Sequence, residues 1–204
     1  MNMFPFDPLT YENLGQSLIS AVLARPIEPI QRLSPFEGPG LYAIYYTGHF
    51  RAYQEIAERN RGSEFSMPIY IGKAEPAGAR KGGRIAGGGT SLYKRLSEHI
   101  ASLVAASDPG EQFMVEDFFC RYLVVTPVWI PLGESMLIDR FRPIWNVLID
   151  GFGNHPPGEN RAGKRSAWDT IHPGRPWAAP LKDHDRSRAE LIERVREHVS
   201  IQPQ

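Results

Sequence analysis

Apolar positions along the chain fall into short runs that predict three strands. The runs are LYAIYY at 41–46, PIYIG at 68–72 and VEDFFCRYLVVT at 115–126. A long polar insertion separates the first two runs, so they cannot form a simple hairpin. Within that insertion the pattern AYQEIAERN indicates a short helix.

Helical spacing of apolar residues marks four other stretches. Residues 11–23 predict a helix near the N-terminus, and residues 186–199 predict a charged helix near the C-terminus. Amphipathic helices are predicted at 92–106, with Ser91 as the N-cap, and at 134–141. The order strand, strand, helix, strand, helix favours an α+β fold with a small three-stranded antiparallel sheet flanked by helices.

The chain is expected to form a single domain, 1–204, in three parts. These are an N-terminal helical arm (1–36), an α+β core (37–150) and an irregular basic C-terminal extension (151–204). A hydrophobic content of 42% is sufficient to bury a core. Because no stretch reads as a signal peptide or a membrane span, we expect a cytoplasmic protein without a membrane partner.

Charge is balanced overall but sorted into blocks. The chain has 23 basic and 23 acidic residues, so composition alone indicates no nucleic-acid partner. Residues 73–99 hold six basic and two acidic residues, 151–188 hold seven and four, and 100–141 hold two and six. The two basic blocks fit an anionic ligand and also fit ordinary solvated loops. The single cysteine, Cys120, excludes an internal disulfide and a zinc site of several thiolates.

Three tyrosines on the first predicted strand present a choice between packing and chemistry. Strand alternation sends Tyr42 and Tyr46 to one face and Tyr45 to the other, so one face must accommodate two phenol hydroxyls. Tyrosine is common in strands, and packing alone is a sufficient explanation at this point.

Glu134 is a carboxylate whose position on its predicted helix indicates a functional role. On the helix predicted at 134–141 it shares a face with Leu137 and Phe141, so it points toward the apolar core. A carboxylate in that position needs a cation, and in a phosphate site it suits Mg²⁺. The alternative is that Glu134 lies in the first helical turn, where it suits the helix dipole and reaches solvent.

Arg95 and His99 form a second group of candidate residues. They are four residues apart on the helix predicted at 92–106, so they lie on one face beside its apolar stripe. An arginine fork suits phosphate oxygens, and a histidine can exchange a proton near neutral pH. The alternative is a solvated helix edge on which Glu98 supplies a countercharge.

The glycine-rich segment GRIAGGGTS has part of a nucleotide-binding pattern. Gly83 and Gly88 have the spacing of a P-loop, but Gly89 stands where its lysine is required before Thr90. We therefore reject ATP binding at this segment. A basic loop against a DNA backbone, or an ordinary loop, fits better.

Taken together, these elements resemble the GIY-YIG nuclease family over residues 38–148. The resemblance rests on GLY at 40–42, YIGKA at 70–74, an arginine and a glutamate on successive helices, and WN at 145–146. The long insertion, the histidine after the arginine and the tail GNHPPGENRAGKRSAWDTIHPGRPWA resemble its type II restriction endonuclease branch, which cuts a GC-only six-base palindrome. The sequence departs from the family at Leu41, which replaces isoleucine, and in the long spacing between the two tyrosine motifs.

The resemblance implies a general base and the groups around an attacking water. Tyr42 would be the general base, provided that nearby cations lower its pKa or that His99 accepts its proton. Tyr70 and Lys73 would orient and polarise the water. Arg95 would neutralise a non-bridging oxygen of the scissile phosphate.

The resemblance also implies a metal and its products. Glu134 would hold one Mg²⁺, for which Mn²⁺ can substitute, and Asn146 would support the site through side-chain hydrogen bonds. Hydrolysis would leave a 5′ phosphate and a 3′ hydroxyl.

Double-stranded DNA is the implied partner, and the basic blocks would contact it. Arginine reads guanine bidentately, so an arginine-rich tail suits a GC-rich target such as CCGCGG. The expected contacts are Arg80, Lys81, Arg84, Arg161, Lys164, Arg165 and Arg175. A palindrome implies a homodimer on DNA, and restriction implies a cognate DNA methyltransferase as a genetic partner without a stable complex.

Two other functions are compatible with the sequence. A GIY-YIG nuclease of repair or mobile-element type would cut branched DNA or weakly specified sites. A catalytically silent DNA-binding module would keep the fold, but it would not need an inward carboxylate beside the other catalytic candidates.

Overall fold

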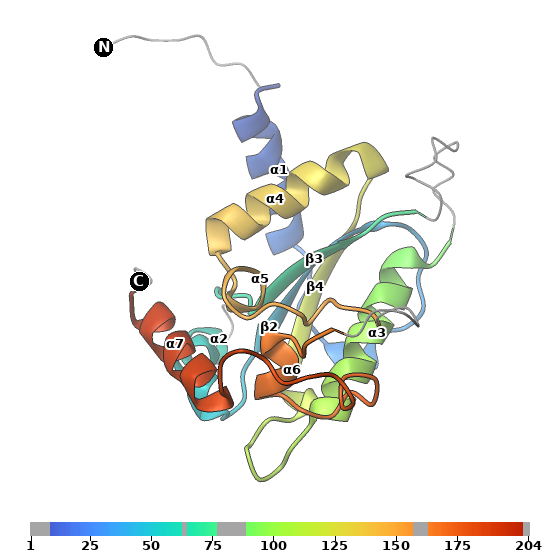
Figure 1. The fold of residues 1–204 in the computed structure, drawn as a ribbon. Coiled ribbons are helices and arrows are strands. Elements are labelled where there is room, and N and C mark those ends of the chain that lie inside the picture. Colours follow the sequence, from blue (N-terminus) through green and yellow to red (C-terminus); the bar gives the residue numbers. More distant parts are fainter. Residues whose placement is uncertain (1–8, 63–64, 77–88, 157–162, 202–204) are drawn as a thin grey trace.

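The computed structural model describes residues 9–62, 65–76, 89–156 and 163–201. At its centre lies a four-stranded antiparallel sheet in the order β1-β4-β2-β3 (Figure 1). The strands are β1 (Glu28–Pro29), β2 (Gly40–Tyr46), β3 (Tyr70–Ala74) and β4 (Phe118–Val124). The three longer strands lie where the apolar runs predict them.

The prediction of a three-stranded sheet was wrong by one short edge strand. β1 comes from the N-terminal arm and pairs with β4, placing Glu28 opposite Cys120 and Pro29 opposite Phe119. Proline has no backbone N–H to donate, which an edge strand tolerates and a central strand does not. A strand of two residues, one of them proline, leaves no alternating pattern by which the sequence could reveal it.

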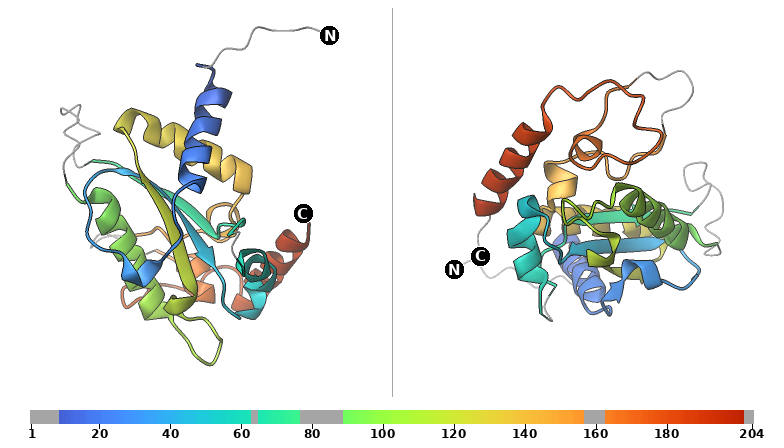
Figure 2. Two further views of the ribbon diagram at one scale, coloured as in Figure 1. Left: turned by 180° about the vertical axis from the view of Figure 1, so that it is seen from behind. Right: turned by 90° about the horizontal axis from the view of Figure 1, so that it is seen from below.

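Helices cover both faces of this sheet (Figures 1 and 2). α1 (Tyr11–Leu23) and α4 (Ile130–Phe141) pack together over one face. The other face is covered by α3 (Ser91–Ala106), α5 (Ile144–Val147) and α6 (Ala167–Ile171). Two further helices, α2 (Gln54–Asn60) and α7 (Arg188–Ile201), lie side by side at one end of the sheet. Short 3₁₀ turns are η1 (Ile30–Arg32), η2 (Arg51–Tyr53), η4 (Val115–Asp117) and η5 (Pro127–Trp129).

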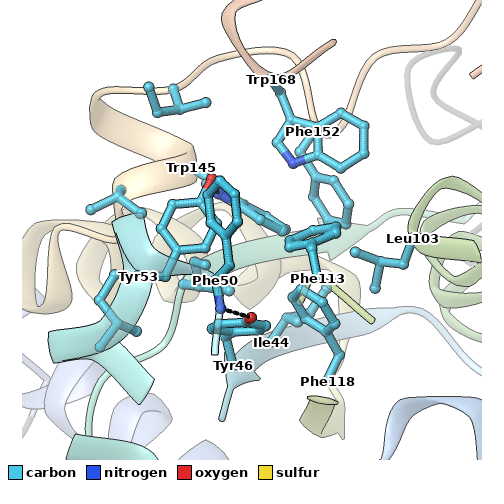
Figure 3. Packing of buried hydrophobic residues seen from close by; sticks show 14 of the residues in the cluster. Ile44, Tyr46, Phe50, Tyr53, Leu103, Phe113, Phe118, Trp145, Phe152 and Trp168 are labelled. Carbon is cyan, nitrogen blue, oxygen red and sulfur yellow. Dashed lines mark hydrogen bonds between the residues drawn. The ribbon is translucent and has the colours of Figure 1, made fainter. Parts of the chain in front are cut away.

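Strand β2 is buried on both faces and divides the interior into two apolar clusters. Tyr45 belongs to the smaller cluster under α1 and α4, whereas Tyr42 and Tyr46 belong to the larger one. In the larger cluster, aromatic rings of the insertion, the core and the C-terminal extension pack together (Figure 3). The rings include Phe50, Tyr53, Phe113, Phe118, Trp145, Phe152 and Trp168.

Tyr45 and Tyr46 have satisfied hydroxyls inside these clusters. The Tyr45 hydroxyl accepts from Arg121 Nη1 at 2.9 Å. The Tyr46 hydroxyl accepts from the Phe50 N–H at 2.9 Å and donates to the Gln112 carbonyl at 3.1 Å (Figure 3). Both side chains therefore serve packing, while Tyr42 is considered below.

Two helix boundaries differ from the sequence prediction. α4 begins at Ile130, with proline in its first turn, so Glu134 lies beyond the first turn and the helix-dipole alternative does not apply to it. α3 begins at Ser91 with Thr90 as its N-cap, and the Ser91 hydroxyl instead donates to the Gly38 carbonyl at 3.3 Å.

The C-terminal extension contains the short helix α6, which the sequence pattern does not predict, and is packed against the core. Trp168 and Ile171 of α6 are buried in the larger cluster, as are Leu191 and Val195 of α7. These apolar side chains of the extension are thus part of the core. None of the helices in the described part of the chain has the length and apolarity that a membrane span requires.

Candidate active site

The sheet and the helices α3, α4 and α5 bring the catalytic candidates together on the β2–β3 side of the molecule. In the antiparallel register of these strands, Tyr42 lies opposite Gly72 and Leu41 opposite Lys73. A Cβ at Gly72 would overlap the Tyr42 hydroxyl, so glycine leaves the space that the phenol occupies. The Tyr42 and Tyr70 ring centroids are 6.1 Å apart.

Tyr42 and His99 form a buried hydrogen-bonded pair. The Tyr42 oxygen is 2.6 Å from His99 Nε2, and both side chains are almost inaccessible to solvent. Burial holds the pKa of His99 well below its usual value, and the nearby Arg95 charge lowers it further. His99 is therefore a neutral imidazole in the free protein.

The pKa of Tyr42 moves in the opposite direction from the one that a free phenolate needs. Burial raises it well above its usual value and the neighbouring Tyr70 adds to this, while the charge and hydrogen bond of Arg95 only partly offset them. The nearby cations therefore do not prepare a phenolate in the free protein. The 2.6 Å contact places the Tyr42 oxygen beside His99 Nε2, which fits the second option, transfer of the proton to histidine.

The Arg95 fork has three hydrogen-bond acceptors at the mouth of the site. Its Nη1 donates to Glu98 Oε2 and His155 Nε2, both at 2.9 Å. Its Nη2 donates to the Gly153 carbonyl at 2.7 Å. A guanidinium has five N–H donors, so a phosphate oxygen could bind Arg95 without loss of these three contacts.

Glu134 and Lys73 form an ion pair next to the tyrosines. Lys73 Nζ is 3.1 Å from Glu134 Oε2 and 3.3 Å from Glu75 Oε1. Burial opposes protonation of Lys73, but the hydrogen bonds and charges of Glu134 and Glu75 outweigh it and raise the lysine pKa. Lys73 thus supplies the cation that the inward carboxylate of Glu134 needs.

The donor set around Glu134 fits a hard divalent cation with few protein ligands. Within the described residues, no group of three or more His, Cys, Asp or Glu side chains could together hold a metal. Mg²⁺ keeps most of its waters and needs only one or two carboxylates, and Glu134 is about one-quarter exposed. The residues present therefore fit Mg²⁺ better than a cation that needs a closed protein cage.

Asn146 on α5 holds strand β3 in place. Its Oδ1 accepts from the Ile71 N–H and its Nδ2 donates to the Ile71 carbonyl, both at 2.8 Å. These two bonds fix the backbone directly after Tyr70. Asn146 therefore acts on the site through the strand rather than by touching a substrate.

A cavity of about 490 Å³ opens beside Lys73 and Arg95, the two catalytic candidates that line it. Its lining also includes Glu75, Lys94, Glu98 and His155. Three cations against two carboxylates leave an excess of positive charge, which suits a phosphate group.

Of the expected DNA contacts, Lys164, Arg165 and Arg175 lie in the described part of the chain, and none of these three lines this mouth. Arg80, Lys81, Arg84 and Arg161 lie outside the described residues. Lys164 is paired with Asp185, and Arg165 Nη1 is 3.2 Å from Asp183 Oδ1, so both bind carboxylates of the extension itself.

Arg175 has a structural position inside the protein. Its side chain is 2% exposed, and its Nε donates to Asp169 Oδ1 at 2.6 Å. Its other nitrogens donate to the carbonyls of Phe152, at 3.1 Å, and Gly151, at 2.9 Å. With its donors occupied and its surface covered, Arg175 is not placed to contact DNA.

Three residues at this site were not identified from the sequence. Phe152, Gly153 and His155 approach His99, Tyr70 and Arg95 from the beginning of the C-terminal extension. They stand in a segment without periodicity, and the only signal in the sequence is that Gly153 and His155 belong to the tail that resembles the restriction branch.

Comparison with known families agrees with this geometry. A family model described as the Eco29kI GIY-YIG domain matches residues 34–199. The match covers all seven catalytic candidates and continues through the C-terminal extension as far as α7. The comparison with curated proteins gave no match.

Proposed function

Because the chain belongs to the Eco29kI GIY-YIG family of restriction endonucleases, we propose that it is a type II enzyme that hydrolyses double-stranded DNA at a short GC-rich palindrome. CCGCGG is the candidate site, and the products would carry a 5′ phosphate and a 3′ hydroxyl. The observation that carries the catalytic part of this proposal is the 2.6 Å contact between Tyr42 and neutral His99, beside Arg95 and Glu134.

The proton of the attacking water would move in two coupled steps. As the water oxygen attacks phosphorus, Tyr42 takes the water proton and passes its own hydroxyl proton to His99 Nε2. No free phenolate forms, which agrees with the raised pKa of Tyr42. His99 starts neutral and ends as a cation, so it must release the proton before the next turnover.

Substrate binding would open the path to the Tyr42 oxygen. In the free protein the Tyr42 side chain is fully buried, and the charge of Arg95 acts on its oxygen. If Arg95 moves toward a non-bridging phosphate oxygen, water would be able to reach the phenol oxygen. Phosphate binding and activation of the base would then be coupled through one guanidinium.

The remaining polar groups would place the phosphate and the water. Tyr70 and Lys73 border the water position, and the ammonium of Lys73 favours negative charge on the attacking oxygen. Glu134 would hold Mg²⁺, which as a Lewis acid would stabilise charge on the phosphate and the leaving O3′. Asn146 keeps Tyr70 in register through its bonds to the Ile71 backbone.

A palindromic target requires two active sites on opposite strands, so we propose that two copies of the chain act together on DNA. A restriction enzyme also requires protection of host DNA, which a methyltransferase would provide without a stable complex between the two proteins. The chemistry within one copy does not depend on either proposal.

Digestion of plasmids that contain varied GC-rich palindromes tests the proposed function. Wild-type protein with Mg²⁺ should give discrete fragments with ends at one palindrome, and EDTA should abolish cutting. Glu134→Ala should lower the cleavage rate by at least about 10²-fold, because the carboxylate that holds the cation is lost. Asp139→Ala, an exposed acidic position on the same helix, should cut like the wild type.

Three outcomes would contradict the proposal in different ways. Cleavage confined to branched DNA would indicate a repair or mobile-element nuclease. Binding without cleavage under any divalent metal would indicate a silent DNA-binding module. Full activity in EDTA, or in Glu134→Ala, would remove the metal from the mechanism.

A further inference from the structure

Buried contacts of Arg175 hold the start of the C-terminal extension in place. The Arg175 guanidinium binds Asp169 and the carbonyls of Gly151 and Phe152, and both charged side chains are 2% exposed. The same guanidinium lies between two indole rings, 4.5 Å from the centroid of Trp168 and 4.6 Å from that of Trp177. A buried network with this many satisfied groups holds the backbone before Gly153 in one conformation.

The side chain of Phe152 connects this backbone segment to the imidazole of His99. The two rings are stacked, with centroids 4.4 Å apart and planes at 14°. The Phe152 ring also meets Tyr70 edge to face at 5.0 Å. Because a stacked ring limits rotation of the imidazole, Phe152 keeps His99 Nε2 directed at the Tyr42 hydroxyl.

Gly153 and His155 make the corresponding contacts with Arg95. The Gly153 carbonyl accepts from Nη2 and His155 Nε2 accepts from Nη1, so two acceptors from one segment hold the fork. A Cβ at Gly153 would lie 2.7 Å from the Tyr70 hydroxyl and 3.0 Å from Arg95 Nη2. A side chain at this position would therefore displace two groups of the site.

We propose that residues 152–155 are part of the catalytic apparatus, positioning Arg95 and His99, and that the extension is therefore required for the chemical step itself. This inference rests on the proposed nuclease function. Phe152, Gly153 and His155 are positioning residues, since they act through Arg95 and His99. The Asp169–Arg175 pair would hold residues 152–155 in the position that these contacts require.

Gly153→Ala tests the inner contact. DNA cleavage should be measured in single turnover at saturating DNA, together with DNA affinity in the absence of divalent metal. The variant should cleave about 100-fold more slowly, because a displacement of about 1 Å at a reacting group has an effect of this size, and its Kd should stay within about threefold. Gly163→Ala is the matched control, because a Cβ there meets open space, and it should behave like the wild type.

His155→Ala tests the outer contact at a position where folding is not at risk, since the side chain is 65% exposed. The rate should fall about tenfold, the effect of losing one hydrogen bond to a charged group. His155→Gln keeps an acceptor and should recover most of the rate, whereas a side chain with no role in positioning Arg95 would give no such rescue.

The results separate the inference from the function on which it rests. If the wild type and Gly163→Ala cut DNA and both Gly153→Ala and His155→Ala cut equally fast, the inference is wrong and the nuclease function stands. If a slow Gly153→Ala variant also has a thermal unfolding midpoint far below that of the wild type, its rate is set aside. The comparison of His155→Ala with His155→Gln then tests the inference. If the wild type never cuts DNA, the proposed function fails and the inference fails with it.

Discussion

At the scale of single residues, the proposed chemistry rests on a tyrosine and a histidine joined by a buried hydrogen bond. Burial raises the pKa of Tyr42 and lowers that of His99, so each favours its neutral form before substrate binds. A neutral pair 2.6 Å apart can still move a proton when an oxygen nearby becomes acidic during attack. The pair is thus suited to relay a proton rather than to store a phenolate.

Substitution of His99 by glutamine distinguishes a relay from simple orientation. Glutamine can accept a hydrogen bond from Tyr42, but its amide cannot take up the proton at neutral pH. His99→Gln should therefore lower the single-turnover cleavage rate by about 10²-fold or more while DNA affinity is kept. A variant that cleaves within a few-fold of the wild type would show that His99 only orients the phenol.

How far the sequence reveals these residues depends on their position in the chain. Tyr42, Tyr70 and Lys73 stand in short motifs on strands, and the helical spacing of Arg95 and His99 is visible in sequence. The contacts of His155 and Gly153 with Arg95 join positions about 60 residues apart, which no local pattern encodes. The direction of the Tyr42 pKa shift also required the burial that only the fold reveals.

At the scale of elements, a second tyrosine–histidine pair joins the insertion to the extension. The Tyr53 oxygen of η2 is 2.6 Å from His172 Nε2, directly after α6, and accepts from Trp145 Nε1 at 3.0 Å. Three elements on one face of the sheet are thus held by a single buried chain of hydrogen bonds.

This arrangement predicts lower stability in acid. Burial holds the pKa of His99 and of His172 well below the usual 6.5, so the unfolded chain binds protons that the folded protein excludes. The stability from each neutral histidine is fully present above about pH 6.5 and decreases as pH falls below that value. Between pH 7.5 and 5 each histidine can remove at most about 2 kcal/mol from the free energy of unfolding.

Urea unfolding of the wild type and of His172→Gln at several pH values measures the effect. The variant should be less stable at pH 7.5, because the buried network is disturbed, but its stability should fall less steeply toward pH 5. An equal slope in both proteins would show that His172 is not excluded from protonation by the fold.

Element boundaries show where pattern reading is sufficient and where it is not. α1 spans the predicted residues 11–23, because its apolar spacing is clear and Thr10 caps it. β1 and α6 are too short to show a period, and they form because tertiary contacts hold them. α4 starts four residues before the predicted 134, since Pro131 is acceptable in a first helical turn.

At the scale of the whole molecule, a net charge of zero conceals two opposite surfaces. The active-site mouth is lined by Lys73, Lys94 and Arg95 together with Glu75 and Glu98, so cations are in excess there. A second cavity, of about 570 Å³ between α2 and α7, is lined by Glu55, Glu58, Glu193 and Glu197 together with Arg51 and Arg196. A polyanion is therefore expected to approach from the side of α3 and β3, away from α2 and α7.

The central claim is that the Tyr42 hydroxyl takes part in the chemistry of DNA cleavage. It is tested most directly by the single-turnover rate of Tyr42→Phe at the palindrome that plasmid digestion identifies. Tyr45→Phe is the matched control, because it removes a hydroxyl from the same strand on the opposite face. Both variants should bind DNA like the wild type. The predicted result is a loss of about 10³-fold or more in Tyr42→Phe and a nearly unchanged rate in Tyr45→Phe. Cleavage by Tyr42→Phe within a few-fold of the wild type would contradict the claim.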